Sequence, residues 1–316
     1  MLQKLRTSPY TSLAPALTLI LVMLGASLLY AIAESLGFIS VIGQSDVSFR
    51  AYRAALAADS EFWVSLAFSL WVSVTATLLA STFALLVAVW LNDHRAQSDT
   101  LALNWNLAFP HLVFATALLL FLSQSGLFAR WAASLGLITA TDQFPILVRD
   151  RYGIGIILHY VGKEIPFLTL IVLAVLRSQP IGYDVVAQNL GANRWQRLRH
   201  ITIPQVTPAL LSGALLVFGF IFSSYEVPAI LGVGYPRALP VLALRFFLDP
   251  DLRARSEGMV LSLIITAIVM LVAVVSLRLE NAPSSPALPP DGEGSLSPLS
   301  LRERARVREK GLTHDD

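Results

Sequence analysis

Six long apolar stretches restrict this 316-residue chain to a membrane-spanning fold. Each has about the 20 residues that a helix needs to cross the ~30 Å hydrocarbon core of a bilayer. Hydrophobic residues make up 55% of the chain and charged residues only 14%, so a soluble fold would leave large apolar surfaces in water. Because unsatisfied backbone groups are not tolerated in lipid, each stretch is predicted to be a helix. The stretches cover approximately residues 13–36, 62–91, 103–122, 154–176, 209–231 and 259–279.

The stretches differ in the features that shape a helix. The first follows basic residues, as a signal peptide does, but its length and the lack of a convincing cleavage site favour a retained helix. The second carries a ladder of serine and threonine, which allows close packing inside a bundle. Pro110 and Pro166 predict kinks in the third and fourth, and Glu226 and Pro228 interrupt the fifth near its end.

Basic residues in the short loops predict the orientation. With a cytoplasmic amino terminus, the inside segments are residues 1–12, 92–100, 177–208 and the carboxyl-terminal tail. The segment 177–208 contains several arginines and a single acid, Asp184, whereas the outer loops mix arginines with acids. Both termini and the segment 177–208 are therefore predicted to lie in the cytoplasm.

Composition divides the chain into three parts. Residues 1–60 hold the first helix and an outer loop, which is periplasmic if the family resemblance described below holds, and residues 61–280 hold a core of five membrane helices. Residues 281–316 are rich in proline, serine and glycine and then in arginine, so they are predicted to be a disordered cytoplasmic tail. Either this tail is solvated and without function, or its basic end lies near anionic lipid headgroups.

The segment from Asp184 to Pro204, DVVAQNLGANRWQRLRHITIP, is a polar hairpin between two apolar stretches. Asp184 is placed in the first turn of a short helix, where its charge suits the helix dipole. Gly191 can adopt the left-handed conformation that ends a helix, and Asn193 can cap the next one. The second helix is predicted over residues 194–201.

An apolar edge is expected on this second helix. Trp195, Leu198 and Ile201 recur at intervals of three and share a face. Thr207 and Pro208 are then expected to cap and begin the fifth membrane helix. A compact knob with an apolar edge suits a groove on a partner protein. The alternative is a hairpin lying on the membrane surface, with Trp195 in the interface and arginines on phosphates.

Three charged residues fall in or near the fourth and fifth stretches. Lys163 lies about 14 Å into the fourth stretch, next to Glu164, and Tyr225 and Glu226 lie near the outer end of the fifth. A charge inside the bilayer must face protein or water. These four residues are candidates for the translocation pathway. A buried ion pair that holds the helices in register is an equally open interpretation.

Several chemistries lack their sequence signatures. The chain has no cysteine, and its five histidines are scattered, so no metal site is expected. The phosphate-cradling pattern G-x-x-x-x-G-K-S/T and the nucleophile pattern G-x-S-x-G do not occur. There is no basic patch interleaved with aromatic residues. The sequence therefore predicts no ATP hydrolysis, no cofactor and no nucleic-acid partner.

The polar hairpin resembles the EAA loop of binding-protein-dependent ABC importer permeases. That pattern reads E-A-A, three residues, G, nine residues, I-x-L-P. Gly191 supplies the glycine, Ile201 lies ten positions later, and Ile203 and Pro204 stand where Leu-Pro is usual. The E-A-A positions fall on residues 185–187, of which only the last alanine is retained.

The resemblance extends over roughly residues 61–280, and the region after Glu226 resembles the polyamine, iron, sulfate and thiamine branch of these permeases. It implies an all-α polytopic membrane protein of the type I permease fold with six transmembrane helices. It also implies that the hairpin couples to ATPase subunits. The residues expected to do so are Asp184, Ala187, Gly191, Ala192, Trp195, Arg197, Ile201, Ile203 and Pro204.

The partners and location follow from the same resemblance. It implies cytoplasmic ABC ATPase subunits at the hairpin, a second identical or different permease subunit, and a periplasmic solute-binding protein. The location is then the lipid of the bacterial inner membrane. The solute is expected to be polyamine-like, iron, thiamine or an anion. The main alternative is an ion-coupled secondary transporter that uses Lys163, Glu164 and Glu226. A third class, a membrane enzyme, is disfavoured because the sequence shows no group of residues that would form a nucleophilic or metal site.

Overall fold

The computed structural model describes residues 9–38, 43, 47–94, 99–178 and 182–280, and these residues form helices, turns and loops without strands. The predicted all-α class is confirmed. The elements are α1 (Pro9–Ser35), α2 (Arg50–Ala55), α3 (Glu61–His94), α4 (Asp99–Ala108), α5 (His111–Leu122), α6 (Leu127–Ser134), the 3₁₀ turn η2 (Thr141–Gln143), α7 (Ile154–Ser178), α8 (Gly182–Asn189), α9 (Arg194–Arg197), the π-helical turn η3 (Leu198–Thr202), α10 (Ile203–Ser223), α11 (Glu226–Leu231), α12 (Leu239–Phe247) and α13 (Ala254–Glu280).

Six helical segments of the described chain are long and apolar enough to cross a membrane, as predicted. They are Leu13–Ser35, Glu61–Asn92, His111–Ser134, Ile154–Ser178, Arg194–Ser223 and Ala254–Leu279. The ends of four of them agree with the ends of the predicted stretches to within a few residues. The third and fifth differ from the prediction in ways that have local causes. The predicted tail, residues 281–316, lies outside the described residues.

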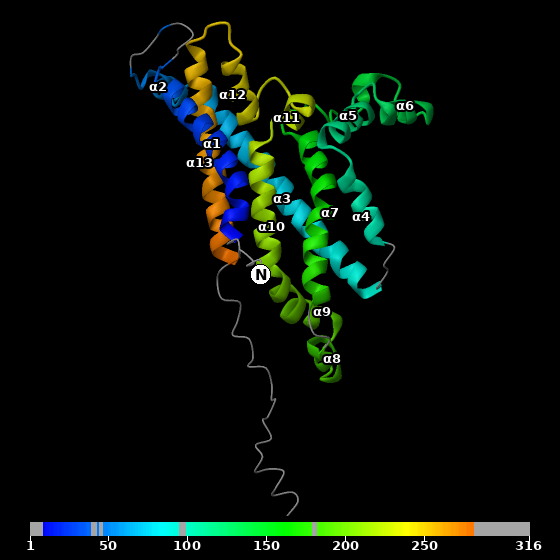
Figure 1. Ribbon diagram of the computed structural model, residues 1–316. Helices are drawn as coiled ribbons and strands as arrows, with labels where there is room; N and C mark the ends of the chain where they lie inside the picture. The colour runs from blue at the N-terminus through cyan, green and yellow to red at the C-terminus, as the bar shows by residue number, and fades with distance from the viewer. Residues whose placement is uncertain (1–8, 39–42, 44–46, 95–98, 179–181, 281–316) are drawn as a thin grey trace, which may run out of the picture. The chain divides into compact units, whose positions relative to one another are not determined.

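The third stretch is divided at Pro110, where only a kink was predicted. Helix α4 ends at Ala108, and α5 begins at His111 after an extended Pro110 with φ −61° and ψ 145°. Proline has no N–H to bond the carbonyl four residues earlier, and its ring clashes with that carbonyl. Figure 1 shows α4 and α5 running in different directions on the two sides of this break. By contrast, α7 continues through Pro166.

The fifth stretch begins earlier than predicted. Helix α10 starts at Ile203 and contains Pro208 in its interior, so the expected cap at Thr207 and first position at Pro208 are wrong. The Thr207 hydroxyl instead donates to the Ile203 carbonyl four residues back, at 2.6 Å. A Thr-Pro pair fits a helix start, but a preceding helical turn can also accept it. At the other end, α10 stops at Ser223, before Glu226.

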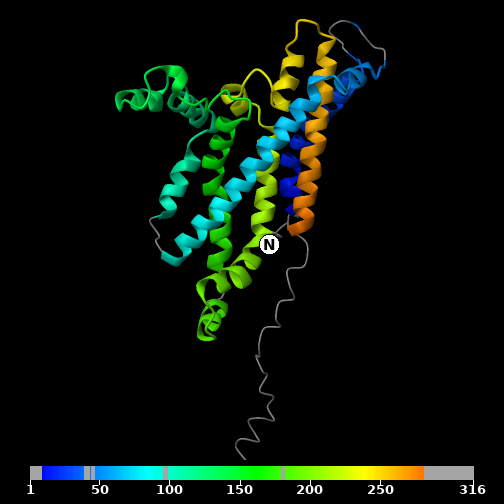
Figure 2. The same cartoon turned by 180° about the vertical axis from the view of Figure 1, so that it is seen from behind.

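The centre of the bundle is the contact between α3 and α7 (Figures 1 and 2), where α3 passes diagonally across α7 and α10. Four alanines at intervals of four residues are fully buried along α3, at positions 76, 80, 84 and 88. Small side chains let two helix backbones approach closely, which is how helices associate in lipid. On α10, Gly213 has the same effect, because a Cβ there would lie 2.8 Å from Ile171 of α7.

The substitution Ala80→Leu is expected to lower the free energy of unfolding by about 1–3 kcal/mol, because extra methyl groups overpack the α3–α7 contact. Ala67→Leu is the matched control, since Ala67 is exposed on the same helix. The measurement is the thermal unfolding midpoint of the detergent-solubilised protein. Equal midpoints for the two variants would show that the alanine row does not set the helix contact.

Helix α13 carries a second layer of packing. It contacts α10, α12, α2 and α1, so the first membrane helix lies against the last one (Figure 1). Buried residues of α10, α12 and α13 form one hydrophobic cluster there, which includes Phe222, Leu239, Leu242, Val260 and Leu261. The described residues up to Glu280 accordingly form one compact unit, which includes the first helix and the predicted core.

Candidate functional site

The polar hairpin, here residues 182–204, lies at the carboxyl-terminal end of α7, and α11 and α12 lie toward the other end of the bundle (Figures 1 and 2). Its turn has the predicted chemistry. Gly191 has φ +84°, a left-handed conformation that favours glycine. The Ala192 N–H donates to the Ala187 carbonyl at 2.9 Å and the Gly191 N–H donates to the Gln188 carbonyl at 3.0 Å. This pair of bonds is a Schellman motif, which closes α8.

Asn193 then begins the second half of the hairpin, as predicted. Its side chain accepts from the Gln196 N–H at 2.9 Å, and the Gln196 side chain accepts from the Asn193 N–H at 2.8 Å. This reciprocal arrangement is a capping box, which satisfies two backbone donors at once. The Schellman motif at the end of α8 and the capping box at the start of α9 lie on the two sides of Gly191. Together they fix the angle between α8 and α9.

The second half of the hairpin is not a separate short helix. The backbone of α9, the π-helical turn η3 and α10 is continuously helical from Arg194 to Ser223, with right-handed helical angles at Leu198, Thr202 and Ile203. The predicted end at Ile201 is therefore wrong. A π turn inserts one extra residue into a helix, and such turns are frequent at functional sites. The hairpin is thus a direct extension of the fifth membrane helix.

Three large apolar side chains are exposed along the hairpin. Leu190 is 83% exposed, Trp195 is 64% exposed and Val186 is 56% exposed. The predicted edge of Trp195, Leu198 and Ile201 is only partly correct, because the last two are half-buried. Leu190 was missed, although its spacing of four residues from Val186 on α8 is a signal that places the two on one face.

The other hairpin positions expected to couple to a partner vary in exposure. Pro204 is exposed, and five positions are half-buried: Ala187, Ala192, Arg197, Ile201 and Ile203. Asp184 and Val185 belong to α8, but their side chains lie outside the described part of the structure. The hairpin therefore presents an apolar surface whose centre is Leu190 and Trp195.

A second candidate site is the membrane polar cluster, which consists of Asn106, His111, His159, Lys163 and Glu164. Lys163 is only 3% exposed, and its Nζ donates to the carbonyls of Asn106 and Phe109, each at 2.7 Å. The Asn106 Nδ2 donates back to the Gly162 carbonyl at 3.2 Å. An unpaired carbonyl in apolar surroundings costs about 1–3 kcal/mol, so these bonds stabilise the junction of α4, α5 and α7.

The two histidines and Glu164 continue the cluster along α7. The His111 Nδ1 lies 3.2 Å from the His159 Nε2, and the His111 Nε2 lies 3.8 Å from the Glu164 Oε1. His159 is fully buried. Both rings contact Tyr160, and the His159 ring also contacts Phe114. Polar groups inside a membrane protein are costly and mark functional sites or helix-fixing contacts.

Tyr225 and Glu226 occupy a different position. Tyr225 precedes α11 and is 41% exposed. Glu226 is the first residue of α11 and is also exposed. The described bonds of Lys163 go to carbonyls of the α4–α5 break, so Glu226 is not the partner that holds this buried amine. The structure brings together Lys163 and Glu164 but leaves Tyr225 and Glu226 on the surface.

Three arginines in or near α12 and α13 are paired with acids from other helices. Arg237 and Arg245 both reach Glu61 at the start of α3, with closest distances of 2.8 Å and 3.0 Å. Arg255 lies 3.1 Å from Glu34 of α1 and 4.4 Å from the centre of the Phe247 ring. These pairs, which sequence spacing could not reveal, join α12 and the segment before it to α3, and join α13 to α1.

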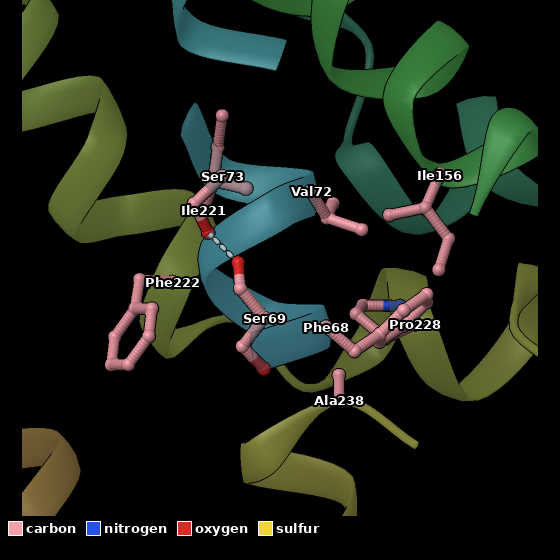
Figure 3. A pocket seen from close by; sticks show the side chains of 9 residues that line it. All are labelled: Phe68, Ser69, Val72, Ser73, Ile156, Ile221, Phe222, Pro228 and Ala238. Atoms are coloured by element: carbon pink, nitrogen blue, oxygen red, sulfur yellow. Dashed lines mark hydrogen bonds between the residues drawn. The ribbon is translucent and has the colours of Figure 1, made fainter. Parts of the chain in front are cut away.

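A small cavity lies between α3, α7, α10, α11 and the residue before α12 (Figure 3). It has a volume of about 10 Å³ and is lined mostly by apolar side chains, including Phe68, Val72 and Ile221. The Ser73 hydroxyl donates to the Ser69 carbonyl at 2.7 Å, and the Ser69 hydroxyl accepts from the Leu239 N–H at 2.7 Å. This volume holds about one water molecule, so it is a packing defect and not a solute site.

Among the described residues, no group of three or more His, Asp or Glu could hold a metal ion.

A helical bundle with six candidate membrane spans and an exposed hairpin between the fourth and fifth has the architecture of a transporter permease. Residues 102–281, more than half of the chain, match the family described as "Binding-protein-dependent transport system inner membrane component". The chain belongs to this family. The predicted resemblance to ABC importer permeases is therefore confirmed.

Individual relatives agree with this assignment. The chain is 30% identical over 220 residues to the inner membrane ABC transporter permease protein YnjC of Escherichia coli, covering 66% of this chain but only 40% of YnjC. It is 30% identical over 229 residues to the probable ABC transporter permease protein y4oQ of Sinorhizobium fredii, covering 70% and 72%. It is 30% identical over 146 residues to the sulfate transport system permease protein CysT of Escherichia coli, covering 45% and 49%.

A solved structure shares the fold. One chain in the crystal structure of a bacterial alginate ABC transporter, in complex with its alginate pentasaccharide-bound periplasmic protein, superposes with a TM-score of 0.70. The alignment covers 87% of this chain and 96% of that chain at 16% identity. This similarity confirms the predicted permease fold. The protein is accordingly a multi-pass protein of the bacterial inner membrane.

Proposed function

We propose that this chain is the membrane-pathway subunit of an ATP-driven importer, without ATPase activity of its own. The observation that carries the proposal is the polar hairpin: two capped helical ends fixed around Gly191, an exposed apolar centre at Leu190 and Trp195, and a continuous helical connection into α10. A stiff knob that extends a membrane helix can transmit movement of a bound partner into that helix.

The partners follow from this arrangement. Cytoplasmic ATPase subunits would contact the apolar surface of the hairpin, and a second permease subunit, identical or different, would complete the pathway. A periplasmic solute-binding protein would deliver the solute at the end formed by α11 and α12. The alginate transporter, whose fold this chain shares, was crystallised with its periplasmic protein, which supports this part of the proposal. Both termini and residues 177–208 would then lie in the cytoplasm, with residues 281–316 as a cytoplasmic tail.

The solute class is the finer part of the proposal. Two relatives bear solute names: CysT is a sulfate permease, and PhnV of Salmonella typhimurium, 26% identical over 201 residues, is a putative 2-aminoethylphosphonate permease. Both names denote small oxyanions. We favour this class over the polyamine, iron and thiamine solutes that the sequence resemblance also allows. Lys163, Glu164, Tyr225 and Glu226 stay candidates for the pathway.

The ion-coupled alternative required Lys163, Glu164 and Glu226 to form one coupling site. Lys163 instead bonds to helix carbonyls, and Glu226 is exposed. No observation on the described residues favours this alternative.

Purification of the native complex in mild detergent tests the proposal. An ATPase carrying the G-x-x-x-x-G-K-S/T loop should co-purify with the chain, and solute uptake into proteoliposomes of the complex should require ATP inside. Uptake driven by an ion gradient by the chain alone, with no ATPase bound, would contradict the proposal.

A further inference from the structure

Two prolines in the described membrane helices leave hydrogen-bond gaps that face each other. In a continuous helix the N–H of residue 110 would bond to the Asn106 carbonyl, and the N–H of residue 166 would bond to the Gly162 carbonyl. Pro110 and Pro166 have no N–H, so both carbonyls lose their usual donor. A carbonyl without a donor is costly in lipid, where water cannot replace the lost bond.

Each gap is filled by a side chain from the other helix. Lys163 of α7 donates to the Asn106 carbonyl at 2.7 Å and to the Phe109 carbonyl at 2.7 Å, while the Phe109 N–H makes a longer bond of 3.3 Å to the Asn106 carbonyl. Asn106 of α4 donates through its Nδ2 to the Gly162 carbonyl that Pro166 leaves free, at 3.2 Å. Asn106 takes part in both bonds. Its carbonyl accepts from Lys163, and its side chain donates to the Gly162 carbonyl, so the exchange is reciprocal.

The geometry around the exchange brings the helices close together. Gly162 has no side chain, and a Cβ at this position would lie 3.3 Å from the Phe114 ring of α5. Lys163 is nearly fully buried, so solvent does not compete for its bonds. The Lys163 Nζ and the Asn106 Nδ2 thus both donate to backbone carbonyls, whereas the Asn106 Oδ1 is buried without a hydrogen-bond partner.

We propose that Asn106 and Lys163 are positioning residues that form a reciprocal clasp, in which each fills the gap that a proline opens in the other helix. The clasp joins the α4–α5 break to the proline turn of α7, so that the two irregular points bend together. It also places His111, the first residue of α5, beside His159 and Glu164 of α7.

The clasp gives the polar hairpin a route to the membrane polar cluster, a consequence that rests on the proposed function. The hairpin follows α7 in the chain, and the clasp lies on α7 at Gly162 to Pro166. Movement of α7 would then move α4 and α5 together with it. The clasp itself is a property of the helix packing, and its test needs neither an ATPase nor a solute.

The test is a set of substitutions in the full chain, purified in detergent. Lys163→Met and Asn106→Leu keep similar volumes but remove the donors, and each should lower the thermal unfolding midpoint by about 5 °C or more. Hydrogen exchange should become faster in peptides from both α4 and α7 in either variant, because the two gaps share one clasp.

Replacement of the prolines separates the clasp from a general loss of packing. Pro110→Ala restores the N–H that bonds to the Asn106 carbonyl in a continuous helix, so it should recover at least half of the loss in Lys163→Met but none of the loss in Asn106→Leu. Pro166→Ala restores the donor for the Gly162 carbonyl, so it should recover Asn106→Leu but not Lys163→Met. The two mismatched pairs are the controls.

Equal recovery in matched and mismatched pairs would overturn the clasp, because it would show that the alanines simply strengthen the helices. Unchanged midpoints in both single variants would also overturn it. If a single variant does not yield folded protein, the yield of monodisperse protein from the matched and mismatched double variants gives the same comparison. Recovery of yield only in the matched pairs supports the clasp, and recovery in both or in neither overturns it.

Discussion

Gly191→Val is expected to reduce capture of the ATPase subunits by at least tenfold while the membrane helices stay folded. Gly191 has φ +84°, which costs a residue with a side chain roughly 1–2 kcal/mol and a β-branched one more. No atom lies within 4 Å of the position that its Cβ would occupy, so the effect is conformational and not a clash. Valine should therefore unwind the Schellman turn and change the angle between α8 and α9.

Gly136→Val is a matched control for this prediction. Gly136 has φ +72°, has open space around its missing Cβ, and follows α6 with the same pattern of backbone bonds. The two variants should lose similar amounts of stability, but only Gly191→Val should lose the ATPase in a co-purification measured by quantitative mass spectrometry. Retention of the ATPase by Gly191→Val would show that the turn does not position the docking surface.

Leu190→Asp is expected to weaken ATPase binding by about 2 kcal/mol or more, roughly 30-fold, without lowering the unfolding midpoint. Leu190 is 83% exposed, so the folded chain alone gains little from its apolar side chain. In a complex it would be the centre of the buried contact, where a charged group without a partner is costly.

Leu248→Asp controls for the general effect of an added charge on an exposed leucine. Leu248 is 68% exposed at the carboxyl end of α12, away from the hairpin. Titration of each purified chain with the ATPase, followed by fluorescence anisotropy, should give weaker binding only for Leu190→Asp. Equal affinities for the two variants would place the docking surface elsewhere.

Much of the fold could be predicted from the sequence, because the bilayer imposes a simple length and composition on a spanning helix. The turn of the hairpin could also be predicted from the sequence. Gly191 and Asn193 act through backbone bonds to residues within five positions, so their roles follow from local sequence. The bounds of α10 were not accessible in this way, because Thr207 and Pro208 fit both a helix start and a helix interior.

The contacts within the membrane required the structure. Pro110 predicts an irregular helix, but it does not reveal that the Asn106 carbonyl, which loses its usual donor there, accepts from Lys163, 57 positions further along the chain. The pairing of Glu61 with Arg237 and Arg245 spans still larger separations in sequence. Such partners depend on which helix faces meet, and hydropathy does not determine those faces. The exposed Leu190 is a different case, since its spacing from Val186 on α8 could have identified it.

The most direct test of the central claim is a cross-link from the hairpin to its partner in native membranes. The chain has no cysteine, so Trp195→Cys introduces a unique thiol on the exposed surface of the hairpin. With a short thiol-directed photo-cross-linker, this thiol should form an adduct with a protein that carries the G-x-x-x-x-G-K-S/T loop. The adduct should disappear when Gly191→Val is added. An adduct with lipid alone would place the hairpin on the membrane surface and contradict its role as the ATPase docking site.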